Sequence, residues 1–267
     1  MMKKTVALIL ALILVCASFT GCSLTDTSKK SEVKYKVVGD HAAVKELPTV
    51  TGLTEIVIED EYEGLPVTEI PNFSGFNLEY AEKIVIGKNV ETIGEWAFTN
   101  NQKLKEFSVS EENEHFCSVD GVLFTKDMKT LIFRPCGASS TYVIPDTVEE
   151  IRSKAFYKNY NLKNLTLPAS LKTIGEKAFF HCEELENVVM PEAVESIAKD
   201  AFGYCYSLTE MTLPASIKTI GEYAFYNCTS LLSVKVNAKE ADISLGKDWQ
   251  PTNNGLKIDE LKVTFAE

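Results

Sequence analysis

The sequence predicts an α/β repeat solenoid that is rich in β structure, coils right-handedly and has a parallel sheet along one side. Two observations lead to this fold class: a fixed repeat length and a strand pattern that recurs in each repeat. The repeat length of 23 residues separates four successive isoleucines, Ile151, Ile174, Ile197 and Ile220. A fixed period between about 20 and 50 residues is the signature of stacked repeats. One repeat cannot bury its apolar side alone, so stability is expected to come from contacts between neighbouring coils.

Each repeat opens with a short strand pattern, Leu-x-x-apolar-x-apolar-Pro. The pattern is clearest at residues 162–168, 185–191 and 208–214. Alternation of apolar residues with others predicts a strand that buries one of its faces. The proline ends the strand because it has no N–H to donate to the ladder. Strand patterns of this kind recur along residues 53–265 and predict about nine coils.

A run of Ile-Gly-Glu-x-Ala-Phe follows the strand, and it predicts a short helical or 3-10 turn. Alanine is small and phenylalanine is large, so Phe179 is expected to fill the interior of its coil. A corner residue then occurs eight positions after each anchor isoleucine. These corner residues are Asn159, Cys182, Cys205 and Cys228.

The repeats are expected to form one domain over residues 33–267. Residues 33–64 are predicted to be an N-terminal cap, 65–236 the repeats and 237–267 a C-terminal cap, because the ends of a solenoid must be atypical to stay soluble. An insertion at residues 117–136 predicts a β-hairpin that turns near Asp127 and Met128. Insertions in repeat proteins often mark the binding side, but a hairpin that only protects the sheet fits equally.

The repeat unit resembles that of the BspA-type bacterial leucine-rich-repeat proteins. The resemblance rests on the Ile-Gly-Glu-x-Ala-Phe-x-x-Cys run, the Leu-x-x-Leu-x-Leu-Pro strand and the 23-residue period, and it covers most of residues 35–236. The Asp-Gly-Val-Leu-Phe hairpin at residues 120–124 is also similar to an insertion that recurs in that family. The resemblance implies a leucine-rich-repeat coil with an Asn/Cys corner. It also implies a surface protein, since some relatives are adhesins for host matrix proteins.

The N-terminus has the features of a bacterial lipoprotein signal. Lys3 and Lys4 precede an apolar stretch, residues 6–17, that is too short to span a bilayer. Residues 19–22 resemble a lipobox, with Phe19 where such motifs usually carry Leu. We therefore expect a signal peptide at 1–21, lipidation of Cys22 and a polar tether at 22–32. The protein would be exported and anchored outside the cell membrane by lipid alone. An ordinary signal peptide with an incidental Cys22 is the alternative.

The cysteines at the repeat corners suggest buried structural thiols. Cys182, Cys205 and Cys228 share one repeat position and should stack in a column about 5 Å apart. Each takes the place that Asn159 has one coil earlier, which favours a structural role over metal binding or redox chemistry. Cys117 and Cys136 flank the predicted hairpin, and in an exported protein the sequence leaves undecided whether they form a disulfide or stay as two free thiols.

The sequence contains no catalytic constellation, and we expect no enzyme activity, no cofactor and no metal. None of the common nucleophile, metalloprotease or phosphate-loop motifs is present. Paired acids such as Glu183 and Glu184 fall at solvent positions of the repeat. The formal charge of −11 argues against nucleic acid as a partner.

The remaining candidate for function is the outward face of the strands, where polar side chains repeat in columns. We expect this face to bind a protein or glycan ligand at the cell surface, with adhesion to host matrix as one form. A structural role in the bacterial envelope without a host ligand is the alternative, and the columns also serve solubility. A uniformly polar face would favour scaffold or glycan contact, whereas aromatic patches would favour adhesion. The candidate residues are Asn164, Thr166, Asn187, Val189, Glu210, Thr212, Ser233 and Lys235.

Overall fold

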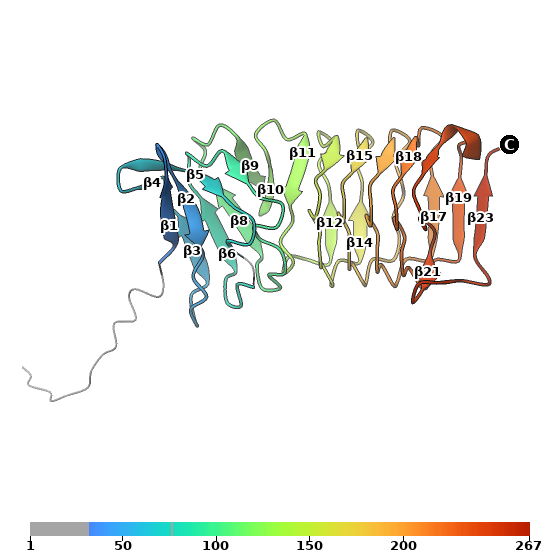
Figure 1. The fold of residues 1–267 in the computed structure, drawn as a ribbon, viewed down its shortest axis with the longest axis horizontal. Helices are drawn as coiled ribbons and strands as arrows, with labels where there is room; N and C mark the ends of the chain where they lie inside the picture. The colour runs from blue at the N-terminus through green and yellow to red at the C-terminus, as the bar shows by residue number, and fades with distance from the viewer. Residues whose placement is uncertain (1–31, 76) are drawn as a thin grey trace, which may run out of the picture.

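A computed structural model of the chain describes residues 32–75 and 77–267. These residues form an elongated rod of about nine stacked coils, with the N-terminal strands at one end and the C-terminus at the other (Figure 1). The predicted signal peptide, Cys22 and all but the last residue of the tether lie outside the described residues. The right-handed sense of the coil stays a prediction.

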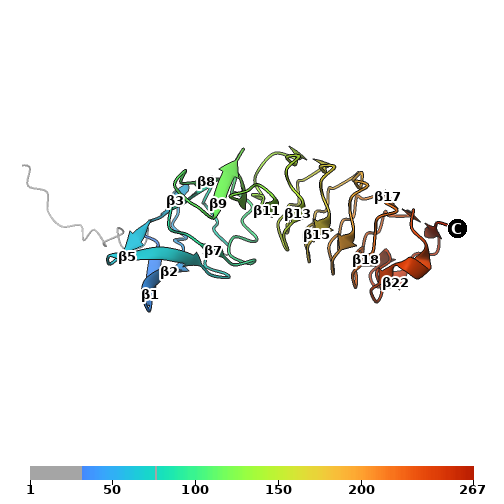
Figure 2. The same ribbon diagram turned by 90° about the horizontal axis from the view of Figure 1, so that it is seen from above.

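The first ladder of parallel strands contains the strands that the proline-terminated pattern predicts (Figures 1 and 2). Its pairing keeps apolar residues in register from coil to coil, as in Ile84 opposite Phe107 and Tyr142 opposite Leu165. The ladder falls into three sections along the rod. They are β3 (Glu55–Ile58), β6 (Lys83–Ile86) and β8 (Glu106–Val109); then β12 (Thr141–Val143) and β14 (Asn164–Thr166); then β17 (Glu210–Leu213), β19 (Ser233–Val236) and β23 (Lys262–Phe265).

A second ladder is made by two-residue strands, four of which consist of a polar residue and the anchor isoleucine that follows it. Ile151, Ile174, Ile197 and Ile220 pair in order with one another, so the anchor isoleucines form a buried column. The structure thus adds a second ladder to the one that the sequence predicts. Its strands are β13 (Glu150–Ile151), β15 (Thr173–Ile174), β16 (Ser196–Ile197), β18 (Thr219–Ile220) and β20 (Ser244–Leu245).

The two ends of the rod carry additional strands. At the N-terminal end β1 (Lys34–Val38) lies antiparallel to β2 (His41–Glu46), and β2 continues to β5 (Leu65–Ile70) and β7 (Thr92–Ile93). The short strand β4 (Glu61–Tyr62) pairs with β5. At the C-terminal end, a 3-10 segment (Glu240–Asp242) precedes a small hairpin of β21 (Thr252–Asn253) and β22 (Leu256–Lys257).

The predicted helical turns are wrong: the Gly-Glu-x-Ala-Phe runs form consecutive β-turns instead. In the coil of Ile174, the N–H of Ala178 donates to Gly175 and that of Phe180 donates to Lys177, each over 3.2 Å. Lys177 and His181 have φ angles of 55° and 61°. A left-handed residue every four positions cannot continue a right-handed helix, so each turn ends after one hydrogen bond.

The core is a column of phenylalanines through the centre of the rod, and Phe179 is fully buried in it as predicted. Its ring centroid lies 4.8 Å from that of Phe156 and 5.0 Å from that of Phe202. Phe202 is in turn 5.5 Å from Phe225. One large ring from each coil therefore fills the interior and contacts the ring of the next.

Glycine follows the anchor isoleucines Ile174 and Ile220, where the coils approach one another closely. A Cβ at Gly175 would lie 2.4 Å from the backbone nitrogen of Ser153 in the preceding coil. A Cβ at Gly221 would lie equally close to the backbone of Ala198 and Lys199. Backbone contact at this distance leaves no room for a side chain at Gly175 or Gly221, whereas Arg152 and Ala198 take the same place in the other two coils.

The insertion is part of the second ladder. Its strands β9 (Phe116–Val119), β10 (Val122–Thr125) and β11 (Thr130–Phe133) are antiparallel, and β11 then pairs in parallel with β13. The buried apolar residues form two clusters that meet at this insertion. Side chains cross the junction: Arg152 donates to the carbonyl of Ile93 over 2.8 Å, and Lys154 pairs with Glu95 over 2.7 Å.

The corner cysteines are buried, unpaired thiols. Cys182, Cys205 and Cys228 are fully buried and free. Cys117 and Cys136 are free as well, so the disulfide that the sequence left open is not formed. Cys117 packs against Met128, with the two sulfur atoms 3.4 Å apart, while the thiol of Cys136 faces the carbonyl of Tyr157.

Candidate functional site

The outward face of the first ladder exposes all eight candidate residues. Those on β14, β17 and β19 lie at alternate positions whose neighbours are buried, as expected for strands with one face in the core. Pairing in register aligns Glu210 with Ser233 and Thr212 with Lys235, so the residues form two parallel columns. The columns are polar except at Val189, whose side chain is 84% exposed.

The ladder is interrupted in the middle of this face. Asn187 forms an isolated bridge with Asn164, but residues 188–190 form no strand. β17 is the edge strand of its sheet: it pairs with β19, on the side away from this segment, and with no strand on the side that faces it. The sequence of residues 185–191 follows the same strand pattern as its neighbours, and the pattern alone does not predict the break.

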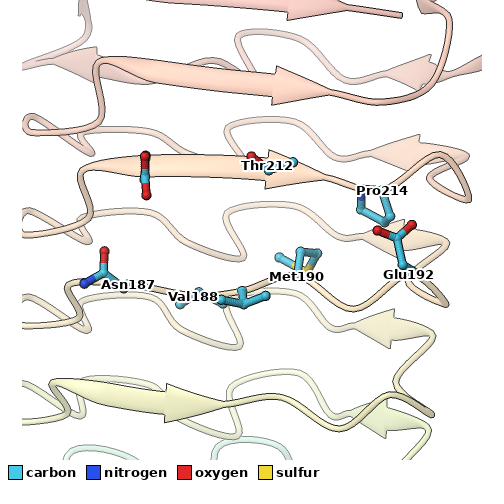
Figure 3. Close-up of a pocket in the computed structure, with 8 residues that line it drawn as sticks. Asn187, Val188, Met190, Glu192, Thr212 and Pro214 are labelled. Carbon is cyan, nitrogen blue, oxygen red and sulfur yellow. The ribbon is translucent and has the colours of Figure 1, made fainter.

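The interruption coincides with a cleft of about 290 Å³, shown in Figure 3. Asn187, Val188 and Met190 line it from one coil, and Thr212 and Pro214 line it from the next. Val188 and Met190 are buried and supply an apolar base. Four of the eight candidate residues line this cleft: Asn187, Val189, Glu210 and Thr212.

Two carboxylates line the cleft without a cationic partner. Glu192 and Glu210 are exposed, and neither forms an ion pair within residues 32–75 and 77–267. Other glutamates along the rod are paired with lysines 23 residues away, although Glu150 and Glu184 form no ion pair within the described residues. Glu186 pairs with Lys163 over 3.0 Å, and Glu195 pairs with Lys218 over 2.7 Å. The cleft is therefore acidic, because two carboxylates and no cationic side chain line it.

A second hollow of about 350 Å³ lies next to Asn164 and Thr166, and it contains a residue that sequence reasoning missed. Arg134 is fully buried there and has no carboxylate partner in the described part of the chain. Its guanidinium donates to Asn159 and to the carbonyl of Ser139, and it lies 5.4 Å from the ring centre of Tyr142. Loss of hydration lowers the pKa of Arg134. Because the Arg134 side chain is inaccessible to solvent, we assign it a structural role: it holds the loop that follows β11.

The described residues contain no arrangement for metal binding or for nucleophilic catalysis. No group of three or more His, Cys, Asp or Glu side chains converges in that part of the chain. His181 pairs with Glu183 over 2.8 Å at the surface, whereas the adjacent Cys182 points inward and donates to the carbonyl of Phe156. Burial raises the pKa of Cys182, so this thiol is kept protonated.

The repeats match a known family. The model of the BspA type leucine rich repeat region matches six copies over residues 16–119 and 126–246. The chain belongs to the BspA-type leucine-rich-repeat family. A search of the curated proteins finds no match.

This BspA-type protein is also similar to solved bacterial structures. The pneumococcal vaccine antigen PcpA shares 26% identity with a TM-score of 0.64, over 80% of this chain and 62% of that one. A leucine rich cell surface protein from Faecalibacterium prausnitzii shares 21% identity with a TM-score of 0.51, over 72% of this chain and 62% of that one. The chain thus spans less than two thirds of either structure. None of the helices in the described residues has the length and apolar character to cross a bilayer.

Proposed function

We propose that this BspA-type protein is a cell-surface binding protein whose cleft takes an extended, basic segment of a protein partner. The observation that carries the proposal is the pair of unneutralised carboxylates, Glu192 and Glu210, beside the exposed Val189. A lysine or arginine of the partner would pair with the carboxylates, and its neighbouring apolar side chain would cover Val189. The negative charge of the chain, −11, adds long-range attraction for a basic partner.

The break in the ladder supports binding of an extended chain. Residues 188–190 and the facing edge of β17 are not paired as strands, and unpaired extended segments are sites where a peptide adds its own backbone. A cleft of about 290 Å³ admits the side chains of a short segment and no more. The rest of the contact would spread over the polar columns on β14 and β19.

The same proposal places the protein outside the cell, attached through lipid at Cys22, and includes adhesion to host matrix. The family supports a surface role, and BspA-type repeats support binding or structure more than catalysis. If Cys22 carries the lipid, Cys22→Ala moves the protein from the membrane fraction to the medium. Unchanged partitioning of this variant rules out the anchor and leaves the cleft proposal untouched.

Binding is tested with the purified chain, residues 32–267, against a panel of extracellular-matrix proteins and isolated envelope material. Val189→Arg and the double variant Glu192→Lys/Glu210→Lys should each weaken binding to a matrix protein at least about tenfold. Glu195→Lys is the matched control, because its carboxylate lies outside the cleft and is paired with Lys218. Equal affinity of the cleft variants and wild type contradicts the proposal.

Point variants are preferred to removal of the insertion. Because β11 pairs directly with β13, deleting the hairpin would break the second ladder and change the fold.

A scaffold of the bacterial envelope is the second candidate function, and the evenly polar columns favour it. Saturable binding to envelope material alone, with none to any matrix protein, would favour the scaffold.

A further inference from the structure

A continuous row of aromatic side chains runs along the turn edge of the rod, away from the cleft residues in every coil. We name the row Trp96, Tyr157, Phe180, Tyr204 and Tyr226 the tyrosine ribbon. Successive ring centroids are 5.2, 5.6, 5.1 and 5.5 Å apart. All five side chains are partly exposed, Phe180 included.

The ribbon is not required to close the core. The interior column of Phe156, Phe179, Phe202 and Phe225 is complete and fully buried without it. Each ribbon ring beyond the insertion comes one or two residues after one of these phenylalanines. Gly203 stands where the other coils have the ring, and a Cβ there would lie 2.9 Å from the ring of Phe180. In this coil the next residue, Tyr204, supplies the ring, so the row continues from Phe180 to Tyr226 without a gap.

Two of the three lysines that lie over ribbon rings are paired with carboxylates. Lys154 lies over the ring of Trp96 and pairs with Glu95. Lys177 lies over Phe180 and is 3.2 Å from both Glu176 and Asp200. Lys158 lies over the ring of Tyr157 and bonds to Asn100, with no carboxylate partner in the described residues. The ribbon therefore has hydroxyl groups and a small formal charge that is positive, in contrast to the acidic cleft.

The ribbon ends in a cavity of about 930 Å³ under the C-terminal cap. Tyr226 belongs to both: its ring is 5.5 Å from Tyr204 and 5.5 Å from Tyr223, and both Tyr223 and Tyr226 line the cavity. The other lining residues are apolar, apart from Asp248, Gln250, Thr252 and Lys257. Concave sites of this size that combine aromatic side chains with polar groups are typical of ligand sites.

The β21–β22 hairpin that covers the cavity is held in a defined place. The hydroxyl of Thr252 donates to Asn227 over 3.2 Å and accepts a hydrogen bond from the N–H of Asn227 over 3.0 Å. Gly255 has a φ of 78° and donates to Asn227 over 3.1 Å. The side-chain amide of Gln250 has no partner within the described residues, and it is available to a ligand.

We propose that the tyrosine ribbon and this cavity bind an uncharged, β-1,4-linked polysaccharide, with the chain end in the cavity and the following sugars along the ribbon. The site shares no residue with the acidic cleft. A polymer of identical units matches a surface on which similar rings recur in each coil. The apolar C–H faces of the terminal sugars would pack on the aromatic side chains that line the cavity, and the sugar hydroxyls would bond to Gln250 and to tyrosine hydroxyls at the edge of the ribbon.

Two features favour a neutral glycan over a charged ligand or a peptide. Asp248 and Lys257 carry opposite formal charges, so the cavity has no net charge with which to select an ion. Of the three lysines that lie over ribbon rings, Lys154 and Lys177 are ion-paired and Lys158 alone adds a formal charge. A peptide would present side chains that change from one residue to the next, and a repeating ring surface offers no register for them.

The test uses residues 32–267 and two defined probes, cellohexaose and chitohexaose, with polygalacturonate as a charged comparison. Isothermal titration should show saturable binding of one hexaose. Tyr226→Leu, which keeps an apolar side chain but removes the ring and hydroxyl, should weaken this binding at least about tenfold. Gln250→Ala should weaken it by a smaller factor. Tyr62→Leu is the matched control, since Tyr62 stacks on Tyr35 in a pair outside the ribbon.

The outcomes separate cleanly. Binding of either hexaose that is lost in Tyr226→Leu but kept in Tyr62→Leu supports the proposal, and the preferred hexaose shows whether the N-acetyl group is recognised. Absence of hexaose binding, binding of polygalacturonate alone, or equal binding by Tyr226→Leu overturns it. If Tyr226→Leu melts at a lower temperature, Gln250→Ala decides alone, because its side chain makes no hydrogen bond that supports the fold.

Discussion

The thiol of Cys205 donates a hydrogen bond to the backbone carbonyl of Phe179 in the preceding coil, over 3.2 Å. Cys182 and Cys228 make the same contact with the coils before them. At the N-terminal side, the amide of Asn101 donates to the carbonyl of Gly75 in the same manner. These corner residues therefore share one contact along the rod: each donates a hydrogen bond to a backbone carbonyl of the preceding coil.

We expect Cys205→Ala to lower the free energy of unfolding by about 1–3 kcal/mol, because the variant loses the hydrogen bond and leaves a small void. Urea denaturation of the purified chain measures the change. Cys205→Ser, which keeps a donor at the same place, should be less destabilising than Cys205→Ala. If the alanine variant is as stable as wild type, the thiol does not link the coils.

The thiols should differ sharply in reactivity. Burial raises the pKa of Cys205 well above that of a free thiol and raises that of Cys136 to about 12. Cys117 is half-buried, and we expect a thiol reagent to label it first in the native protein. Mass spectrometry of peptides after timed labelling checks the order. In Cys117→Ser, rapid labelling should disappear until denaturant is added; rapid labelling of Cys205 would contradict its burial.

The neighbouring residues Phe179 and Phe180 should respond differently to truncation. Phe179→Ala removes a fully buried ring from the interior column and should cost about 3–5 kcal/mol of unfolding free energy. Phe180 lies on the partly exposed ribbon, and Phe180→Ala should cost clearly less. Thermal and denaturant unfolding measure both variants. Equal costs, or a cost for Phe179→Ala below about 1 kcal/mol, would contradict the assigned burial.

The sequence predicts the parts of this fold that repeat, because the physical cause repeats with them. The spacing of Ile151 and Ile174 locates the coils, and the inward-facing Phe179 follows from the same register. The β-turns were not predicted because residues such as Lys177 adopt left-handed φ angles, and nothing in the chemistry of a lysine side chain indicates such an angle. Glycine at these positions would have predicted a left-handed angle, but the chain has lysine, histidine and aspartate there.

The candidate site was only partly predictable for a related reason. Alternation alone places Asn187 and Glu210 on the outward face, and the structure exposes both. The break between them depends on how two coils pair, and residues 185–191 carry the same pattern as coils that do pair. Arg134 and the C-terminal cavity occur once each, at the insertion and at the cap, so no repeat reveals them.

Asn101 should be among the least replaceable side chains on the N-terminal half. It is buried, donates to Gly75 and Phe98, and accepts the N–H of Leu78 over 2.6 Å. Asn101→Ala leaves these buried backbone groups without partners, and we expect a cost of more than about 2 kcal/mol. Gln102→Ala, next in the chain but exposed, is the control for denaturant unfolding. A similar, small effect of both substitutions would show that the network is not needed.

Acid should weaken one contact between coils in a defined direction. Lys172 and then Lys129 lower the pKa of Glu149 below its ordinary value of 4.5 through their hydrogen bonds. A carboxyl whose pKa is lowered by folding stabilises the folded state above its unfolded pKa, and that contribution disappears as the pH falls through the folded pKa. The stability difference between wild type and Glu149→Gln should therefore be largest near neutral pH and vanish well below pH 4.5. Thermal unfolding of both proteins over this pH range measures it, with Glu150→Gln as the neighbouring control. A difference that grows as the pH falls would mean that the lysines do not stabilise the Glu149 carboxylate.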